Sequence, residues 1–266
     1  MLRNELATLF RRRRTQAMLA ALAVVPVLIS VVVRVTGGPG GGEGPQFLSQ
    51  VTHNGVFAVL AGLTVTLPFF LPMAVTVVAG DAIAGEAGLG TLRYLLVRPA
   101  GRGRLLATKA VAVVAFCLAA TATVAAAGLL AGVALFPLDR VTTLSGDTLS
   151  LPVGMARIGL AALLVAVSLF GIAALGLFVS TMTDVPVGAM AATLALFIAI
   201  GVLNALPQLD AIHPFLLTNY WTSYADLLRT DIRWGDIARN VGLQGLYLAA
   251  FGSAAWARLT TKDVLG

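Results

Sequence analysis

Residues 86–109 read EAGLGTLRYLLVRPAGRGRLLATK. The stretch contains five Lys or Arg residues and one acidic residue, and glycine and proline interrupt it. Long apolar runs flank it on both sides. A basic, polar segment between two such runs indicates a loop that joins two membrane-spanning helices. The stretch therefore indicates a membrane protein, because the flanking runs suit lipid whereas the stretch itself suits water.

The composition of the whole chain supports a membrane location. Of its 266 residues, 58% are hydrophobic and 11% are charged, whereas soluble domains have about 25% charged residues. A water-soluble fold of this size could not cover its surface with so few charges. The one cysteine, Cys117, lies in an apolar run, which excludes a disulfide within the chain and a cysteine-based metal site.

Six apolar runs are long enough to cross a bilayer, which takes about 20 mostly apolar residues. No run has the alternating pattern of strands. We therefore expect an all-α integral membrane protein with one transmembrane domain over residues 1–266. The predicted spans are residues 17–35, 56–80, 105–136, 155–180, 185–206 and 241–257.

Residues 1–16 predict an amphipathic leader helix that lies on the membrane surface. Its apolar residues recur at helical spacing. A long apolar run follows without a clear small-residue cleavage site, so we interpret that run as an uncleaved span and not as a signal peptide. The apolar positions of the leader are Leu2, Leu6, Leu9 and Phe10.

The distribution of positive charge predicts the orientation. With six spans, one side of the membrane holds 12 of the 18 Lys and Arg residues but only 5 of the 12 acidic residues. The side with the excess of Lys and Arg is cytoplasmic, so both termini are expected there, and the basic pI requires no nucleic acid partner. A run of arginines before the first span is interpreted as a topology anchor, with a specific anionic-lipid site as the alternative. These residues are Arg11, Arg12, Arg13 and Arg14.

The outer loop, residues 207–240, precedes the last predicted span. Its aromatic residues suit the membrane interface. Tyr224, Leu227 and Leu228 share one side of a helical pattern. We therefore expect a short amphipathic helix that rests on the outer membrane face.

Catalytic and metal-binding patterns are missing. The two histidines, His53 and His213, lie in or near outer loops and lack the local spacing of metal ligands. No nucleophile elbow and no phosphate-binding loop with its lysine occurs. The spans contain almost no ionisable residues, which argues against an ion-coupled transporter. We expect a chain that is not an enzyme, binds no cofactor and depends on another protein for energy.

The basic loop, residues 81–104, predicts a compact helix–turn element. Arg98 precedes Pro99, and a residue before proline avoids helical geometry, so the helical pattern ends there. Gly101 and Gly103 then indicate a turn before the next helix. A solvated loop whose arginines only set the topology is the alternative on charge alone.

This loop resembles the cytoplasmic loop of bacterial ABC transporter permeases of the type-2 (ABC-2-like) transport-permease family. The shared pattern is an acid, Gly-Thr-Leu, a leucine pair, Arg-Pro, a turn with Arg, and a Leu-rich helix start that leads to Lys. Residues 87–89 depart from the pattern, because relatives often have another polar residue there. The matching residues are Glu86, Gly90, Thr91, Leu92, Leu95, Leu96, Arg98, Pro99, Arg102, Leu105, Leu106 and Lys109.

The resemblance implies a permease subunit of an ATP-driven ABC exporter in the bacterial cytoplasmic (inner) membrane. It implies a separate ATPase subunit, which binds ATP and Mg, and a second permease protomer that completes the translocation path as a homo- or heterodimer. The basic loop would be the coupling helix that docks on the ATPase, with Leu92 and Leu95 as apolar anchors. The expected docking residues are Glu86, Gly90, Thr91, Leu92, Leu95, Arg98, Pro99 and Arg102.

Two prolines in the second predicted span, Pro68 and Pro72, each remove a helix hydrogen-bond donor. They form a candidate hinge upstream of the coupling element, with a static kink as the alternative. Two rival functions stay open for the chain. One is an intramembrane enzyme or the membrane anchor of an enzyme, and the other is a stand-alone channel or membrane scaffold.

Overall fold

The computed structural model describes residues 1–36, 51–52, 54–90, 101–138, 141–142 and 147–261. Nearly all of this part is helical, apart from one pair of two-residue antiparallel strands. The helices are α1 Leu2–Arg11, α2 Arg13–Thr36, α4 Phe57–Thr66, α5 Phe70–Gly88, α7 Arg102–Leu135, α8 Leu151–Ser168, α9 Phe170–Met182, α10 Pro186–Asn204 and α11 Trp234–Thr261. The short 3-10 helices are η1 Pro207–Leu209, η2 His213–Phe215 and η3 Trp221–Leu228, and the strands are β1 Val141–Thr142 and β2 Thr148–Leu149.

Five helical stretches of the described chain are long and apolar enough to cross a membrane. They are α2, α5, α7, α10 and the combined stretch of α8 and α9. The fold is therefore that of an all-α, multi-pass membrane protein, as the composition predicts. The sixth predicted span, residues 241–257, lies within α11, which has 28 residues but is not among these five. Its buried polar residues, Asn240 and Gln244, explain why it is less apolar.

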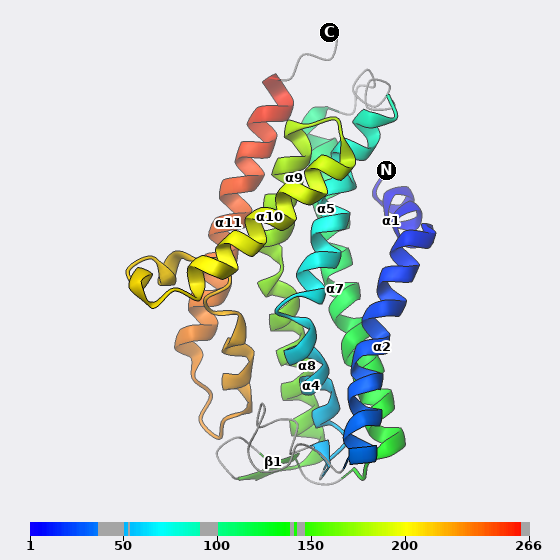
Figure 1. Cartoon of the computed structure of the whole chain (residues 1–266), viewed down its shortest axis with the longest axis vertical. Coiled ribbons are helices and arrows are strands. Elements are labelled where there is room, and N and C mark those ends of the chain that lie inside the picture. The colour runs from blue at the N-terminus through cyan, green and yellow to red at the C-terminus, as the bar shows by residue number, and fades with distance from the viewer. Residues whose placement is uncertain (37–50, 53, 91–100, 139–140, 143–146, 262–266) are drawn as a thin grey trace.

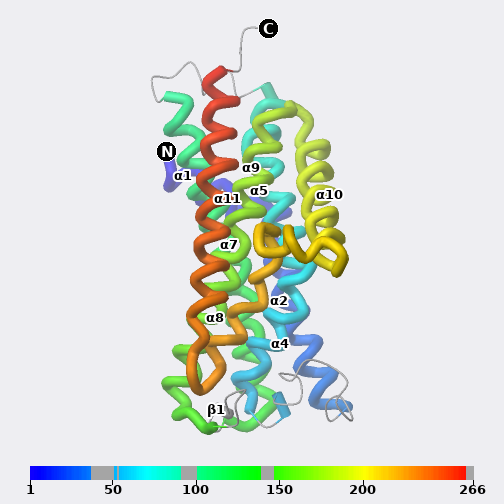
Figure 2. The backbone as a smooth tube through the Cα atoms, turned by 90° about the vertical axis from the view of Figure 1, so that its left-hand side faces the viewer, coloured from blue at the N-terminus to red at the C-terminus, as the bar shows by residue number. Residues whose placement is uncertain are grey.

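Most of the long helices run along the long axis of the molecule, whereas α10 crosses the bundle obliquely (Figure 1). The same end of the bundle holds α1, the start of α2, the end of α5, the start of α7 and the end of α11, at the top of Figure 1. We call this end the basic end. The strands β1 and β2 lie at the opposite end, and α11 extends from near that end to the basic end (Figures 1 and 2).

The second predicted span, residues 56–80, consists of two helices. The first, α4, ends at Thr66, and α5 begins at Phe70 after a turn that contains Pro68. Phe69 leaves helical geometry, with φ −142°. Pro72 is the third residue of α5, where a backbone N–H has no partner within the helix. Pro68 therefore accompanies the interruption, whereas Pro72 is accommodated in the first turn.

The fourth predicted span, residues 155–180, is also divided, because α8 ends at Ser168 and α9 begins at Phe170. Two side chains of α11 hydrogen-bond across this interruption. Gln244 Oε1 accepts the N–H of Gly171 at 3.1 Å, and Asn240 Nδ2 donates to Ser168 Oγ at 2.7 Å. Buried backbone groups in a membrane protein need such partners, so α11 compensates for the interruption.

The predicted amphipathic helix of the outer loop is a 3-10 helix, η3, and its apolar side faces the protein. Tyr224, Leu227 and Leu228 are all buried. Tyr224 Oη lies 2.8 Å from Thr64 Oγ1 of α4, and Arg157 of α8 donates to the carbonyl of Leu227. Burial raises the pKa of Tyr224 above its ordinary value, and the hydrogen bond with Thr64 offsets only part of this rise. The expectation that this helix rests its apolar face on the membrane was wrong, because the bundle itself provides the apolar surface.

Candidate functional site

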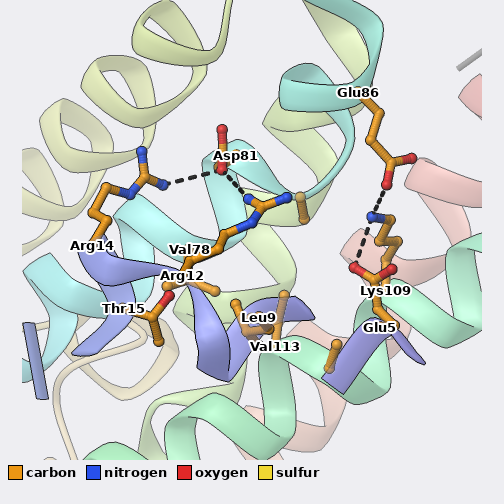
Figure 3. A pocket seen from close by; sticks show the side chains of 12 residues that line it. Glu5, Leu9, Arg12, Arg14, Thr15, Val78, Asp81, Glu86, Lys109 and Val113 are labelled. Carbon is orange, nitrogen blue, oxygen red and sulfur yellow. Dashed lines mark hydrogen bonds and ion pairs between the residues drawn. The ribbon is translucent and has the colours of Figure 1, made fainter. Parts of the chain in front are cut away.

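A buried lysine connects three helices at the basic end. Lys109 of α7 has a side chain that is 4% exposed, and its ammonium group forms ion pairs with Glu86 of α5 and Glu5 of α1. The distance from Lys109 Nζ to Glu5 Oε1 is 2.8 Å. Figure 3 shows both carboxylates directed toward this one nitrogen. Because α5 and α7 flank residues 89–101, this cluster fixes the two helices from which that segment emerges.

A second cluster connects the leader helix to α5. Arg12, which follows α1, and Arg14 of α2 both form ion pairs with Asp81 Oδ2, at 2.9 and 3.1 Å. The Asp81 side chain is largely buried, at 15% exposure, while both arginines are about half exposed. In Figure 3 the two guanidinium groups approach Asp81 from α2 and the turn before it. Asp81 is thus the point at which the N-terminal segment is attached to α5.

The two clusters border a small cavity of about 30 Å³, with Leu9 and Val113 among its apolar lining residues. A cavity of this size holds about one water molecule. Three cations and three carboxylates surround it, so their charges balance. The described residues contain no group of three or more His, Cys, Asp or Glu side chains that could hold a metal ion. The arrangement is suited to joining helices and offers no evident chemistry.

A serine of α9 contacts the backbone of α5 just before these ion pairs. Ser180 Oγ donates to the carbonyl of Gly80 at 2.7 Å and accepts the N–H of Ala84 at 2.8 Å. In a regular α-helix the carbonyl of Gly80 and the N–H of Ala84 would bond to each other. A side chain that bonds to both groups competes with that helix bond, and such competition is a recognised cause of local bending. Ser180 therefore couples α9 to the part of α5 that carries Asp81 and Glu86.

Glycines allow the end of α5 to lie against α10 and the segment before it. A Cβ added at Gly80 would lie 2.9 Å from backbone atoms of Met190 in α10. A Cβ added at Gly88 would lie 2.9 Å from the carbonyl oxygen of Asp184. Both approaches are too close for any larger residue. The last turns of α5 are thus held by α7, α9 and α10 together.

The structure places three of the expected docking residues. Glu86 pairs with Lys109, and Gly90 follows α5 with φ +68°, a conformation that favours glycine. Arg102, in the first turn of α7, donates from Nη1 to the carbonyls of Leu259 and Thr260 at the end of α11. The other expected docking residues lie outside the described residues, and docking stays a prediction for all eight. Those outside are Thr91, Leu92, Leu95, Arg98 and Pro99.

Sequence reasoning missed most of the ion pairs. It included Lys109 in the loop pattern without a partner, and it interpreted the arginine run as a topology anchor, with an anionic-lipid site as the alternative. Within that run, Arg12 and Arg14 pair with Asp81, while Arg11 and Arg13 are exposed. An acid in an otherwise apolar and basic leader, Glu5, was the available signal for a buried cationic partner. The sequence could not indicate which cation that was.

The fold and the site define an all-helical, multi-pass membrane protein without an evident catalytic or metal centre among the described residues. Residues 43–265 match a protein family described as "Protein of unknown function (DUF2705)". The match covers more than half of the chain, so the chain belongs to this family.

A second comparison links part of the chain to a transport protein. Over 107 residues the chain is 37% identical to a protein of Pseudomonas aeruginosa named "Probable ABC transporter permease protein NosY". The matched region covers 40% of this chain and 35% of that relative. The chain thus spans about a third of the length of the curated relative, and the likeness indicates a permease-like membrane protein.

Proposed function

We propose that the chain is the membrane-spanning permease subunit of an ATP-driven ABC exporter of the ABC-2-like type. In this proposal a separate ATPase subunit supplies the energy, and a second permease protomer completes the translocation path. The observation that carries the proposal is the 37% identity over 107 residues to a probable ABC transporter permease. The resemblance of residues 86–109 to the coupling loop of such permeases also supports it.

The geometry of the basic end suits a coupling role. Residues 89–101 connect α5 to α7. The ion pair between Lys109 and Glu86 joins the C-terminal end of α5 to the N-terminal part of α7. A force applied to this connection by an ATPase would therefore move α5 and α7 together instead of separating them. Ser180 and the close contacts of Gly80 and Gly88 would transmit the movement to α9 and α10.

The proposed topology has six spans with α11 as the sixth, and both termini in the cytoplasm. The positions of α1 and of the end of α11 at the basic end support an even number of crossings (Figure 1). The excess of Lys and Arg at this end supports its cytoplasmic location in the bacterial cytoplasmic membrane. Of the two candidate hinge residues, Pro68 and Pro72, we assign the compliant point between α4 and α5 to the turn at Pro68.

Co-purification tests the proposal. The tagged full chain is isolated in mild detergent from its native membrane, and the co-purifying proteins are identified. We expect an ABC ATPase in stoichiometric amount, and we expect no ATP hydrolysis once that partner is removed. The absence of any ATPase from the complex, or robust hydrolysis by the chain alone, would refute the proposal.

A further inference from the structure

An apolar groove lies on the side of the bundle between α7, α9 and α11, near the basic end. Its volume is about 440 Å³. Ala107 and Val111 of α7 line one side, and Leu248 and Gly252 of α11 line the other. Ala173 of α9 contributes to the lining between them. α7 and α9 belong to the stretches that are long and apolar enough to cross a membrane, so the groove lies on a part of the bundle that suits contact with lipid.

Two side chains with polar groups, those of Arg104 and Trp256, belong to the ends of α7 and α11 that lie toward the basic end. Arg104 is exposed and lies one turn before Ala107 on the same side of α7. Trp256 of α11 lines the groove and is 55% exposed. Its Nε1 would lie 3.3 Å from a Cβ added at Gly103, so the indole reaches the start of α7. Figure 2 shows the start of α7 beside the last turns of α11.

The first turn of α7 is rich in positive charge. It contains Arg102 and Arg104 and no acidic residue, although the partial positive charge of a helix N-terminus disfavours cations. Arg102 donates to carbonyls at the end of α11, where the helix dipole is negative. Arg104 has no ion-pair partner within the described part of the chain. An anion beside Arg104 would offset this positive charge.

We propose that the groove binds a phospholipid with an anionic headgroup. One acyl chain lies against Val111, Ala173 and Leu248, and the phosphate accepts hydrogen bonds from Arg104 and from the indole N–H of Trp256. Such a lipid has an apolar chain that suits the groove and a headgroup with net negative charge that suits Arg104. The site does not depend on the proposed transport function, since it requires only that the helices lie in a bilayer.

Fluorescence quenching by brominated lipid tests the site. The full chain is reconstituted in vesicles of phosphatidylcholine and phosphatidylglycerol, and one of the two lipids is brominated at a time. The contribution of Trp256 is the difference between the wild type and Trp256→Phe. We expect brominated phosphatidylglycerol to quench Trp256 more strongly than brominated phosphatidylcholine at equal mole fraction, corresponding to about a fivefold preference, the effect of one cationic side chain near a membrane.

Two pairs of variants separate the site from general surface charge. Arg104→Gln should abolish the preference, whereas Arg258→Gln, which removes an exposed arginine from the last turn of α11, should retain it. Gly252→Leu should reduce quenching by both lipids, because a Cβ at Gly252 enters open space in the groove. Gly245→Leu, at another open position of α11, should not.

The outcomes are decisive in both directions. Equal quenching by the two brominated lipids in the wild-type chain overturns the proposal without any variant. If Arg104→Gln and Arg258→Gln lose the preference for phosphatidylglycerol equally, the proposal is also overturned. That result would mean that the total charge of the basic end, and not Arg104 alone, attracts the lipid. Matching elution and thermal unfolding of each variant and the wild type show that the fold is intact.

Discussion

The two ends of α5 differ in what holds them. At its C-terminal end, α5 is bound by the Glu86–Lys109 ion pair, by Ser180, and by close packing at Gly80 and Gly88. At its start, residues 67–72 make no side-chain hydrogen bond or ion pair within the described part of the chain. Residues 67–72 are all Leu, Pro or Phe, so their side chains hold the start of α5 only by apolar packing, and we expect it to yield before the C-terminal end does.

The exposure of side chains supports this contrast only at two phenylalanines, because Leu67 and Leu71 beside them are buried. Phe69 and Phe70 are 46% and 41% exposed, and their rings contact each other edge to face. By comparison, Ile83 near the other end of α5 is almost completely buried. Buried, hydrogen-bonded backbone opens less readily than exposed backbone with few contacts.

Lys109→Met should have the largest effect, because it removes the cation at the fixed end of α5. Breaking a buried ion pair from one side costs about 3–5 kcal/mol, since it leaves uncompensated buried charge. Thermal unfolding in detergent measures the loss. Adding Glu5→Gln and Glu86→Gln should restore much of the stability. Arg3→Gln, a change at an exposed arginine of α1, should have no measurable effect. Equal losses for Lys109→Met and Arg3→Gln would contradict a buried, paired Lys109.

Ser180→Ala should have a smaller effect at the same end. Without the hydroxyl, the carbonyl of Gly80 and the N–H of Ala84 still have each other as helix partners, so we expect a loss of about 1 kcal/mol. The same unfolding experiment measures it. Ser253→Ala, at an exposed serine of α11, is the matched control and should unfold like the wild type. A loss as large as that of Lys109→Met would show that α5 cannot close its own ladder here.

Pro68→Ala should change the free energy of unfolding least, by no more than about 1 kcal/mol. It should reduce the flexibility between α4 and α5. With the proline removed, α4 and α5 can join into one helix. Distances between spin labels at Val65→Cys and Leu89→Cys, in a Cys117→Ala background, should then become more narrowly distributed. Pro72→Ala should leave the distribution unchanged, because Pro72 lies in the first turn of α5. If Pro72→Ala narrows the distribution as much as Pro68→Ala, the turn at Pro68 is not the compliant point.

The part of the fold that local composition determines could be predicted from the sequence. Long apolar runs predicted the spanning helices, and the spacing of Leu2, Leu6 and Leu9 predicted α1. The division near residue 68 was signalled by Pro68. The division between α8 and α9 was not, because no proline lies there and its partner, Gln244, is 73 residues from Gly171.

The site was harder to predict because its contacts are distant in sequence. Lys109 and Glu5 are 104 residues apart, and nothing local indicates that α1 lies against α7. Tyr224 illustrates the same difficulty, because its apolar neighbours predicted contact with lipid. Instead, Tyr224 packs inside the bundle, where its hydroxyl group hydrogen-bonds with Thr64, 160 residues away in the chain. Amphipathic patterns identify an apolar face but not the surface that covers it.

We propose that the segment between α5 and α7 docks on an ATPase, and pull-down of that ATPase measures this docking. Leu92→Ala and Leu95→Ala are combined in the tagged full chain, with Arg13→Gln as the control at the same end of the bundle. Recovery of the ATPase is then measured at matched membrane levels. We predict a loss of about 30-fold or more in recovery for the double variant, as expected when a buried anchor is worth about 2–4 kcal/mol, and unchanged recovery for Arg13→Gln. Undiminished recovery with the double variant would contradict the account.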